Sequence, residues 1–262
     1  MNTILLIVGV ILKLTAAFFL FISGLLLFFE SSNQQKKSVK YWGLGLLLLS
    51  IISLSDIFIY PGDTQAQLAL YAIRRVLIEI ALILLMMHGT LLLLVPKKHA
   101  KYMIYTYFIA ALVVDFTINK LMSSSILMNL ATHHIYVTLP LSIVSFSYFY
   151  TYHLELHEKS LLKLGLGWGA LFIVSMIMII TAGLGIEIMM EIAHVTEYLI
   201  IIYIAFAFDD LRKSEDHIWH KVTTPKSYVV DSNILNFLND QTGKNCRSLI
   251  EIGLKKQIVE DI

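Results

Sequence analysis

Residues 187–209 read EIMMEIAHVTEYLIIIYIAFAFD, and this stretch decides the class of fold. It is long enough to cross a bilayer, because a spanning helix needs about 20 mostly apolar residues. Apart from Asp209 at its end, its acids and its histidine all lie in its first half: Glu187, Glu191, His194 and Glu197. Charged groups at membrane depth are unfavourable unless they are paired or hydrated. The stretch therefore predicts a transmembrane helix whose first half faces a polar interior.

Six further apolar segments precede this one in the chain. Hydrophobic residues make up 57% of the 262 residues and charged residues only 15%, whereas soluble domains are about one quarter charged. In lipid, backbone polar groups must be satisfied within each segment, so long apolar segments are helices. We predict an all-α polytopic membrane protein, a seven-transmembrane-helix bundle, with its segments at about 3–29, 42–60, 67–95, 101–119, 124–151, 162–184 and 187–209.

Lysine and arginine alternate between successive connections. The first, third and fifth connections and the start of the tail carry them, at Lys36, Lys37, Lys40, Lys97, Lys98, Lys101, Lys159, Lys163, Arg212 and Lys213. The second and sixth connections carry none, and the fourth carries Lys120. Because cytoplasmic connections keep Lys and Arg, we predict an outside N-terminus and a cytoplasmic C-terminus in a multi-pass protein of the plasma membrane.

The chain divides into a bundle, residues 1–210, and a helical cytosolic tail, residues 211–262. We predict a helical extension just after the last crossing and two short amphipathic helices at about 232–239 and 245–260. A tail of this size buries little core alone. It is therefore expected to pack on the bundle, on a second copy, or on a cytosolic protein partner.

Several smaller features predict how the helices pack and end. Gly165-Leu-Gly-Trp-Gly169 has the spacing of small residues that lets a neighbouring helix approach closely. Pro140 is expected to kink the fifth helix near its middle, and the acids Asp209 and Asp210 need a cationic partner at a helix C-terminus. Aromatic residues near helix ends predict anchors at the membrane interface. These anchors are Tyr41, Trp42, Tyr60, Tyr102, Tyr148, Tyr150 and Tyr152.

Ionisable residues from several helices share one depth in the predicted outer half. With a rise of about 1.5 Å per residue, Glu191 lies roughly 6 Å from the outer end of its helix and His194 roughly 10 Å. Exposure of each group to lipid would be unfavourable, so we expect the groups to converge on one polar cavity. The predicted ligand-binding residues are Arg75, Glu79, Asp115, His133, Glu191, His194, Glu197 and Tyr198.

Acids outnumber bases in this part of the bundle. The acids are Asp56, Glu79, Asp115, Glu187, Glu191 and Glu197, and the bases are Lys13, Arg74 and Arg75. Carboxylates without a partner in a low dielectric take up protons or acquire a cation. The predicted ligand is therefore a small cationic or polar molecule, a proton or a metal ion.

A metal ion is one interpretation of the same residues. Glu191-Ile-Ala-His194 places a carboxylate and an imidazole on one helical face, and a site built from His133, His134, His194 and Glu191 would suit zinc. Only one such motif is present, which argues against a di-iron site. Haem between these histidines is disfavoured, and retinal is excluded because residues 187–208 hold no lysine for a Schiff base.

These patterns favour a seven-helix sensor or receptor-like protein with an outward-opening polar cavity and a tail that couples to a partner. An intramembrane zinc-dependent hydrolase using His, Glu and Asp ligands is an alternative, although an enzyme is the less favoured class. A proton- or cation-coupled transporter is a further alternative. The expected partners are the lipid bilayer, a small ligand or ion, and a protein or second copy at the tail, with no nucleic acid.

Overall fold

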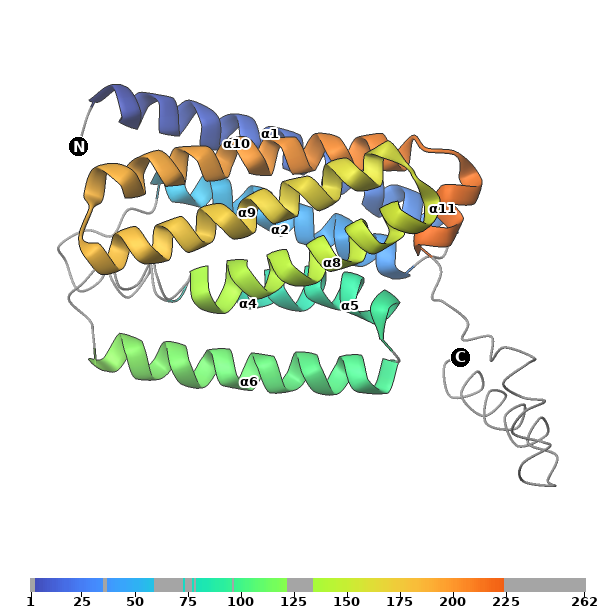
Figure 1. The fold of residues 1–262 in the computed structure, drawn as a ribbon, viewed down its shortest axis with the longest axis horizontal. Coiled ribbons are helices and arrows are strands. Elements are labelled where there is room, and N and C mark those ends of the chain that lie inside the picture. The colour runs from blue at the N-terminus through green and yellow to red at the C-terminus, as the bar shows by residue number, and fades with distance from the viewer. Residues whose placement is uncertain are drawn as a thin grey trace. The chain divides into compact units, whose positions relative to one another are not determined.

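A computed structural model describes residues 3–34, 37–58, 73, 77, 79–95, 97–121 and 134–223, and these residues are helical with short turns and no strand. Figure 1 shows the helices running along one common direction. They are α1 (Thr3–Gln34), α2 (Lys37–Phe58), α4 (Ile80–Leu82), α5 (His88–Leu94), α6 (Lys97–Leu121), α8 (Leu139–Leu156), α9 (Lys159–Leu184), α10 (Glu187–Arg212) and α11 (Asp216–Thr223), with π-helical segments η2 (Ile83–Met87) and η3 (His134–Thr138).

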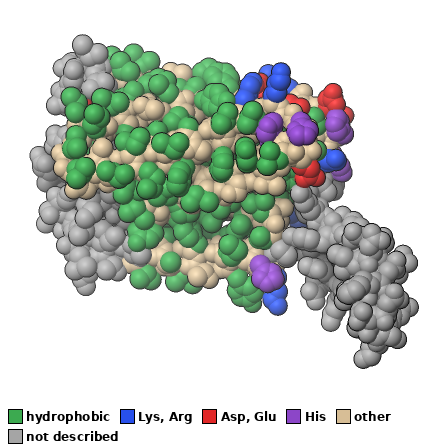
Figure 2. All heavy atoms as spheres, in the orientation of Figure 1, with side chains coloured by type: hydrophobic (Ala, Val, Ile, Leu, Met, Phe, Trp, Pro, Cys, Tyr) green, Lys and Arg blue, Asp and Glu red, His purple; other side chains and the backbone are tan. Residues whose placement is uncertain are grey.

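Four helices are long and apolar enough to cross a membrane. The spans are Ile7–Ser31, Lys37–Ser55, Lys159–Leu184 and Ile188–Arg212, and the shorter apolar stretch Ile80–Leu94 lies between them in the chain. The predicted class, an all-helical membrane protein, is confirmed at this level. Figure 2 agrees with it, because hydrophobic side chains cover the length of the helices while charged side chains and histidines gather at one end.

The helices pack side by side in a ring. Helix α1 packs against α2 and α10, α9 packs against α10 and α8, and α5 with η2 closes the ring between α8 and α2. Helix α6 packs mainly on α5 and lies at the periphery of the ring (Figure 1). We call the end of the bundle where α2, α6 and α9 begin the Lys-rich end, after the lysines in its connections.

Close helix contacts depend on glycine. At Gly43 an added Cβ would lie 2.8 Å from the backbone nitrogen of Phe28, so α1 and α2 pack backbone against backbone. The prediction for the glycine stretch in α9 is confirmed. A Cβ at Gly165 would lie 3.5 Å from the backbone of Tyr150 in α8, and one at Gly167 would lie 2.7 Å from Ile204 in α10. Both neighbours of α9 thus approach it over glycine.

Pro140 stands where the helix changes type. The π-helical segment η3 leads directly into α8, and Pro140 occupies the first turn of α8. Proline cannot donate the hydrogen bond of a helix interior, and π turns accommodate such local changes of hydrogen bonding. At Pro140, where a kink is predicted, the described chain has just changed from π- to α-helix, and the kink itself stays a prediction.

Buried aromatic side chains fill the core near the Lys-rich end. The ring of Trp42 is surrounded at centroid distances of 5.8–6.5 Å by four other rings. We call this group the aromatic cluster: Trp42, Tyr148, Phe149, Phe208 and Trp219. The prediction that Trp42, Tyr148 and Tyr152 anchor the membrane interface is wrong, because all three side chains are buried inside the bundle. Tyr102 and Tyr150 are exposed, as interfacial anchors would be, and Tyr60 lies outside the described residues.

The first part of the tail packs on the bundle. After α10 ends at Arg212 the chain turns at residues 213–215, and α11 buries Ile218, Trp219 and Val222 in the main core. The hydroxyl of Tyr148 donates a hydrogen bond to the carbonyl of Val222. The predicted helical extension is thus broken by a turn. Residues 1–225 form one compact unit, and the predicted helices at 232–239 and 245–260 lie outside the described residues.

Candidate functional site

Several residues of the predicted cavity cannot be placed. Arg75 and His133 lie outside the described residues, and the side chain of Asp115 is not described although its backbone belongs to α6. The side chains of Asp56 and Glu187 are likewise not described, although their backbone belongs to α2 and α10. Their contribution to the cavity stays a prediction.

A group of polar side chains joins α1 to α10. Nδ1 of His194 lies 3.3 Å from Oε2 of Glu197, and the His194 ring meets the Tyr198 ring edge-on at 5.1 Å. The ammonium of Lys13, from α1, lies 5.5 Å from the centroid of the same tyrosine ring. We call these four residues, Lys13, His194, Glu197 and Tyr198, the α1–α10 polar cluster. Three of the predicted ligand-binding residues are therefore brought together.

Burial makes this cluster electrostatically important. The Glu197 side chain is 11% exposed and that of His194 is 34% exposed, while Tyr198 is buried. A buried carboxylate is stable only with hydrogen bonds or an opposite charge beside it. The imidazole of His194 supplies a hydrogen-bonding partner to Glu197, the ammonium of Lys13 lies over the neighbouring Tyr198 ring, and Lys13, Glu197 and Tyr198 each make further contacts. The cluster is a site where gain or loss of one charge would change helix packing.

Three other residues of the predicted sites are described, and no contact between them and the α1–α10 polar cluster is described. Glu191 stands one helical turn before His194 and is half-buried. Glu79 is half-buried immediately before α4 and makes a polar, ionic or ring contact. His134 is buried in η3, and its Nδ1 lies 3.3 Å from Oγ of Ser175 in α9. The partner of His134 is thus a hydroxyl on the next helix.

The described side chains do not assemble a metal centre. Among them, no group of three or more His, Cys, Asp or Glu residues could hold a metal ion. His194 turns its Nδ1 toward Glu197, one turn after it, instead of toward Glu191 in the motif. Because His133 lies outside the described residues, the predicted zinc site that includes it stays a prediction.

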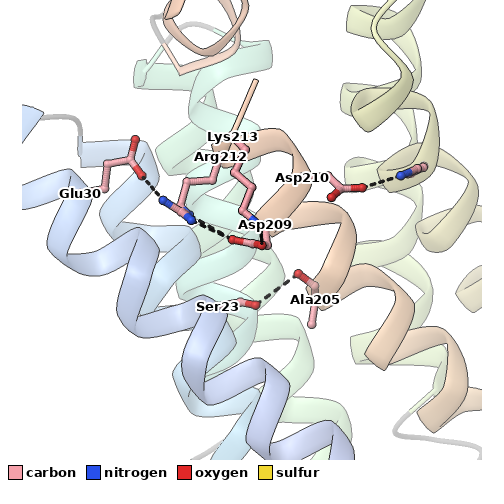
Figure 3. Close-up of polar contacts among 8 residues, drawn as sticks. Ser23, Glu30, Ala205, Asp209, Asp210, Arg212 and Lys213 are labelled. Atoms are coloured by element: carbon pink, nitrogen blue, oxygen red, sulfur yellow. Dashed lines mark hydrogen bonds and ion pairs between the residues drawn. The ribbon is translucent and has the colours of Figure 1, made fainter. Parts of the chain in front are cut away.

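Ion pairs tie the other end of α10 to its neighbours, as Figure 3 shows. Asp209 accepts hydrogen bonds from Arg212 at 3.0 and 3.1 Å and also pairs with Lys213. Arg212 reaches Glu30 of α1 at 4.0 Å. The prediction that Asp209 needs a cationic partner is confirmed, because two basic side chains of the same helix end supply it.

Asp210, the acid next to Asp209, pairs with a different helix. Asp210 binds Lys163 of α9 through an ion pair of 2.5 Å (Figure 3). This contact confirms the cationic partner predicted for Asp210. Asp210 thus connects the end of α10 to α9, while Arg212, which also pairs with Asp209, connects it to α1 through Glu30.

Serine hydroxyls add ties that sequence reasoning missed. Ser23 of α1 donates to the carbonyl of Ala205 in α10 at 3.2 Å (Figure 3), and Ser50 of α2 donates to the carbonyl of Ala17 in α1 at 2.8 Å. Such bonds between helices in an apolar setting contribute about 0.6 kcal/mol on average. The only signal in the sequence is a serine inside an apolar run, and most such hydroxyls bond within their own helix.

Comparisons with protein-family models, with curated proteins and with solved structures gave no significant match. The function of the chain must therefore be argued from its own residues and their geometry.

Proposed function

We propose that this chain is a seven-helix, receptor-like membrane sensor with its N-terminus outside the cell. In this proposal α10 transmits a change in the α1–α10 polar cluster to the Lys-rich end of the bundle, which faces the cytosol. The tail then passes the change to a partner. The observation that carries the proposal is that one helix, α10, holds both a buried polar group in its first half and the ion-pair network at its end.

The distance between these two groups suits transmission by a rigid helix. Glu197 and Asp209 belong to the same uninterrupted helix and are separated by twelve residues, or about 18 Å along the axis. Because the rise per residue of an α-helix is fixed, we expect the two groups to move together. A shift or rotation at His194 would therefore reach Asp209 and Arg212.

The chemistry of the cluster suits a proton or a small cation as the stimulus. His194 faces Glu197 and Tyr198 on its own helix, the ammonium of Lys13 on α1 lies over the same Tyr198 ring, and Glu191 stands one turn before His194. Imidazole is the side chain that changes charge near neutral pH. A proton on His194 would turn its hydrogen bond with Glu197 into an ion pair, and a bound cation would be attracted to the same carboxylate. Either event changes how α1 and α10 attract each other.

The output of the proposed sensor is α11. This helix follows α10 after a turn of three residues, and its side chains Trp219 and Val222 are buried in the core beneath Trp42 and Tyr148. A movement of α10 would therefore change the packing of α11. The chain beyond residue 225, the second compact unit, would receive the change from there.

Hydrogen–deuterium exchange of α11 tests this proposal. The full chain in nanodiscs is compared at pH 7.5 and pH 5.5, with rates corrected for intrinsic exchange, and with ZnCl₂ added at pH 7.5 as a cation probe. We expect exchange at residues 216–223 to change at least threefold in one of these conditions in the wild type. We expect Glu197→Gln and His194→Gln to abolish the change.

Thr196→Val is the matched control, because Thr196 lies on the same turn of α10 and bonds only within its own helix, to the carbonyl of Ile192. It should keep the full response. The proposal is wrong if α11 exchanges equally in all conditions, or if Glu197→Gln and His194→Gln respond as the wild type does.

A further inference from the structure

Basic side chains at the Lys-rich end are distributed unevenly around the ring. On the side of α8 to α11, acids and bases alternate, and Lys163, Arg212 and Lys213 are in ion pairs with aspartates. On the side of α2, α5 and α6, the halves nearest this end, residues 37–48, 88–94 and 97–108, contain no acid. The excess positive charge of the Lys-rich end is therefore concentrated on three helices.

Four basic side chains of α5 and α6 form this surface, which we call the basic surface: His88, Lys98, His99 and Lys101. Lys40 of α2 lies apart from them, because its ammonium is over the ring of Phe28 in α1. None of the lysines of the basic surface forms an ion pair among the described residues. On the face drawn in Figure 2, basic and histidine side chains stand at the Lys-rich end of α6 without acids beside them. Elsewhere at the same end of the bundle, basic, acidic and histidine side chains are mixed.

Contacts between helices fix the centre of the basic surface. The imidazole of His88, on α5, stacks on the ring of Tyr41, on α2, with centroids 4.5 Å apart and planes inclined by 21°. Lys101 stands on α6, which packs on α5. Three helices thus bring a phenol, an imidazole and an ammonium to one level, about one to two turns below the helix ends. Lys98 adds a second ammonium one turn away on α6.

An apolar track continues from this surface along α6. Tyr102, Tyr105, Ile109 and Val113 are each at least 60% exposed and follow helical spacing along the peripheral helix. Paired ammonium groups suit the phosphate of an anionic lipid, and an exposed apolar stripe suits an acyl chain. We propose that the basic surface binds the headgroup of an anionic phospholipid whose acyl chain lies along α6. This proposal requires membrane insertion and does not depend on the proposed sensor function.

Native mass spectrometry of the delipidated full chain in detergent tests the proposal. The probes are dioleoyl phosphatidylglycerol and dioleoyl phosphatidylcholine, titrated separately. We expect saturable binding that prefers phosphatidylglycerol. Each lysine near an anionic lipid contributes about fivefold in affinity, so Lys98→Gln combined with Lys101→Gln should weaken phosphatidylglycerol binding about 25-fold.

A charge-matched variant separates this site from general attraction at the rim. Lys159→Gln combined with Lys221→Gln removes two exposed lysines from the same end but from α9 and α11, and it should change the affinity less than threefold. Equal losses in the two double variants, or no preference for phosphatidylglycerol, would overturn the proposal. Inorganic phosphate is added as a competitor. Displacement of the lipid by an equal concentration of phosphate would point to a soluble phosphate ligand and also overturn it.

Discussion

Alanine at Trp219 is expected to release α11 from the bundle. The Trp219 side chain is 2% exposed and packs against Trp42 at a ring distance of 6.5 Å. Replacing a buried tryptophan by alanine removes about 3–5 kcal/mol of stabilisation. Ile218 and Val222 stay to hold the helix, but each contributes only about 1.5–3 kcal/mol. Since 1.4 kcal/mol corresponds to a factor of ten, docking of α11 should weaken by about 150-fold or more.

Amide exchange measures this release directly. In Trp219→Ala, the amides of residues 216–223 should exchange at least 100-fold faster than in the wild type, or reach the unprotected rate. Amides in the middle of α9 should keep their protection, because they lie elsewhere in the ring. Lys221→Ala serves as the control, since Lys221 is on the exposed side of α11. Exchange of α11 in Trp219→Ala within threefold of the wild type would refute the view that this side chain holds the helix in place.

Two further predictions concern packing and the ion pairs, and thermal unfolding in nanodiscs measures both. Gly43→Ala should lower the unfolding midpoint by several degrees, because its Cβ would meet the backbone of Phe28 at 2.8 Å. Gly9→Ala is the control and should not lower the midpoint, since nothing lies within 4 Å of a Cβ there. Equal effects of the two substitutions would contradict the close contact at Gly43. Asp209→Asn should cost about 1 kcal/mol because it breaks two ion pairs at a partly buried site. Asp210→Asn should lower the free energy of unfolding by only a few tenths of a kcal/mol, because Lys163 and Asp210 are both more than 40% exposed. A larger loss of stability in Asp210→Asn than in Asp209→Asn would contradict this reasoning.

The helices and some of their contacts could be predicted from the sequence because those features depend on composition and spacing. Long apolar runs give helices of spanning length, as in α9 and α10. Acids at a helix C-terminus need cations, and this requirement correctly predicted partners for Asp209 and Asp210. The glycine spacing in α9 predicted close packing for the same reason.

Side-chain direction could not be predicted in the same way. Helices that are apolar on every side give little periodicity to separate the interior from the lipid, so the sequence placed Trp42 and Tyr148 at the membrane interface although both are buried. For His194, Glu191 and Glu197 are both one turn away, and only the rotamers decide that Glu197 is the partner. The contact of Glu30 with Arg212 joins α1 to α10, a separation at which a single sequence carries no signal.

The contacts between α1 and α10 determine how a sensor of this kind can move. The two helices run in parallel, since Lys13 meets Tyr198, Ser23 meets Ala205 and Glu30 meets Arg212 in the same order along both. Sliding α10 along α1 by one turn, about 5.4 Å, would break all three contacts at once. On its other side, the described polar contact between α10 and α9 is the exposed pair at its end, Lys163 with Asp210, which is the weaker kind of ion pair. For the proposed sensor, these contacts predict that α10 moves together with α1 and is displaced against α9, where Ile204 packs closely over Gly167.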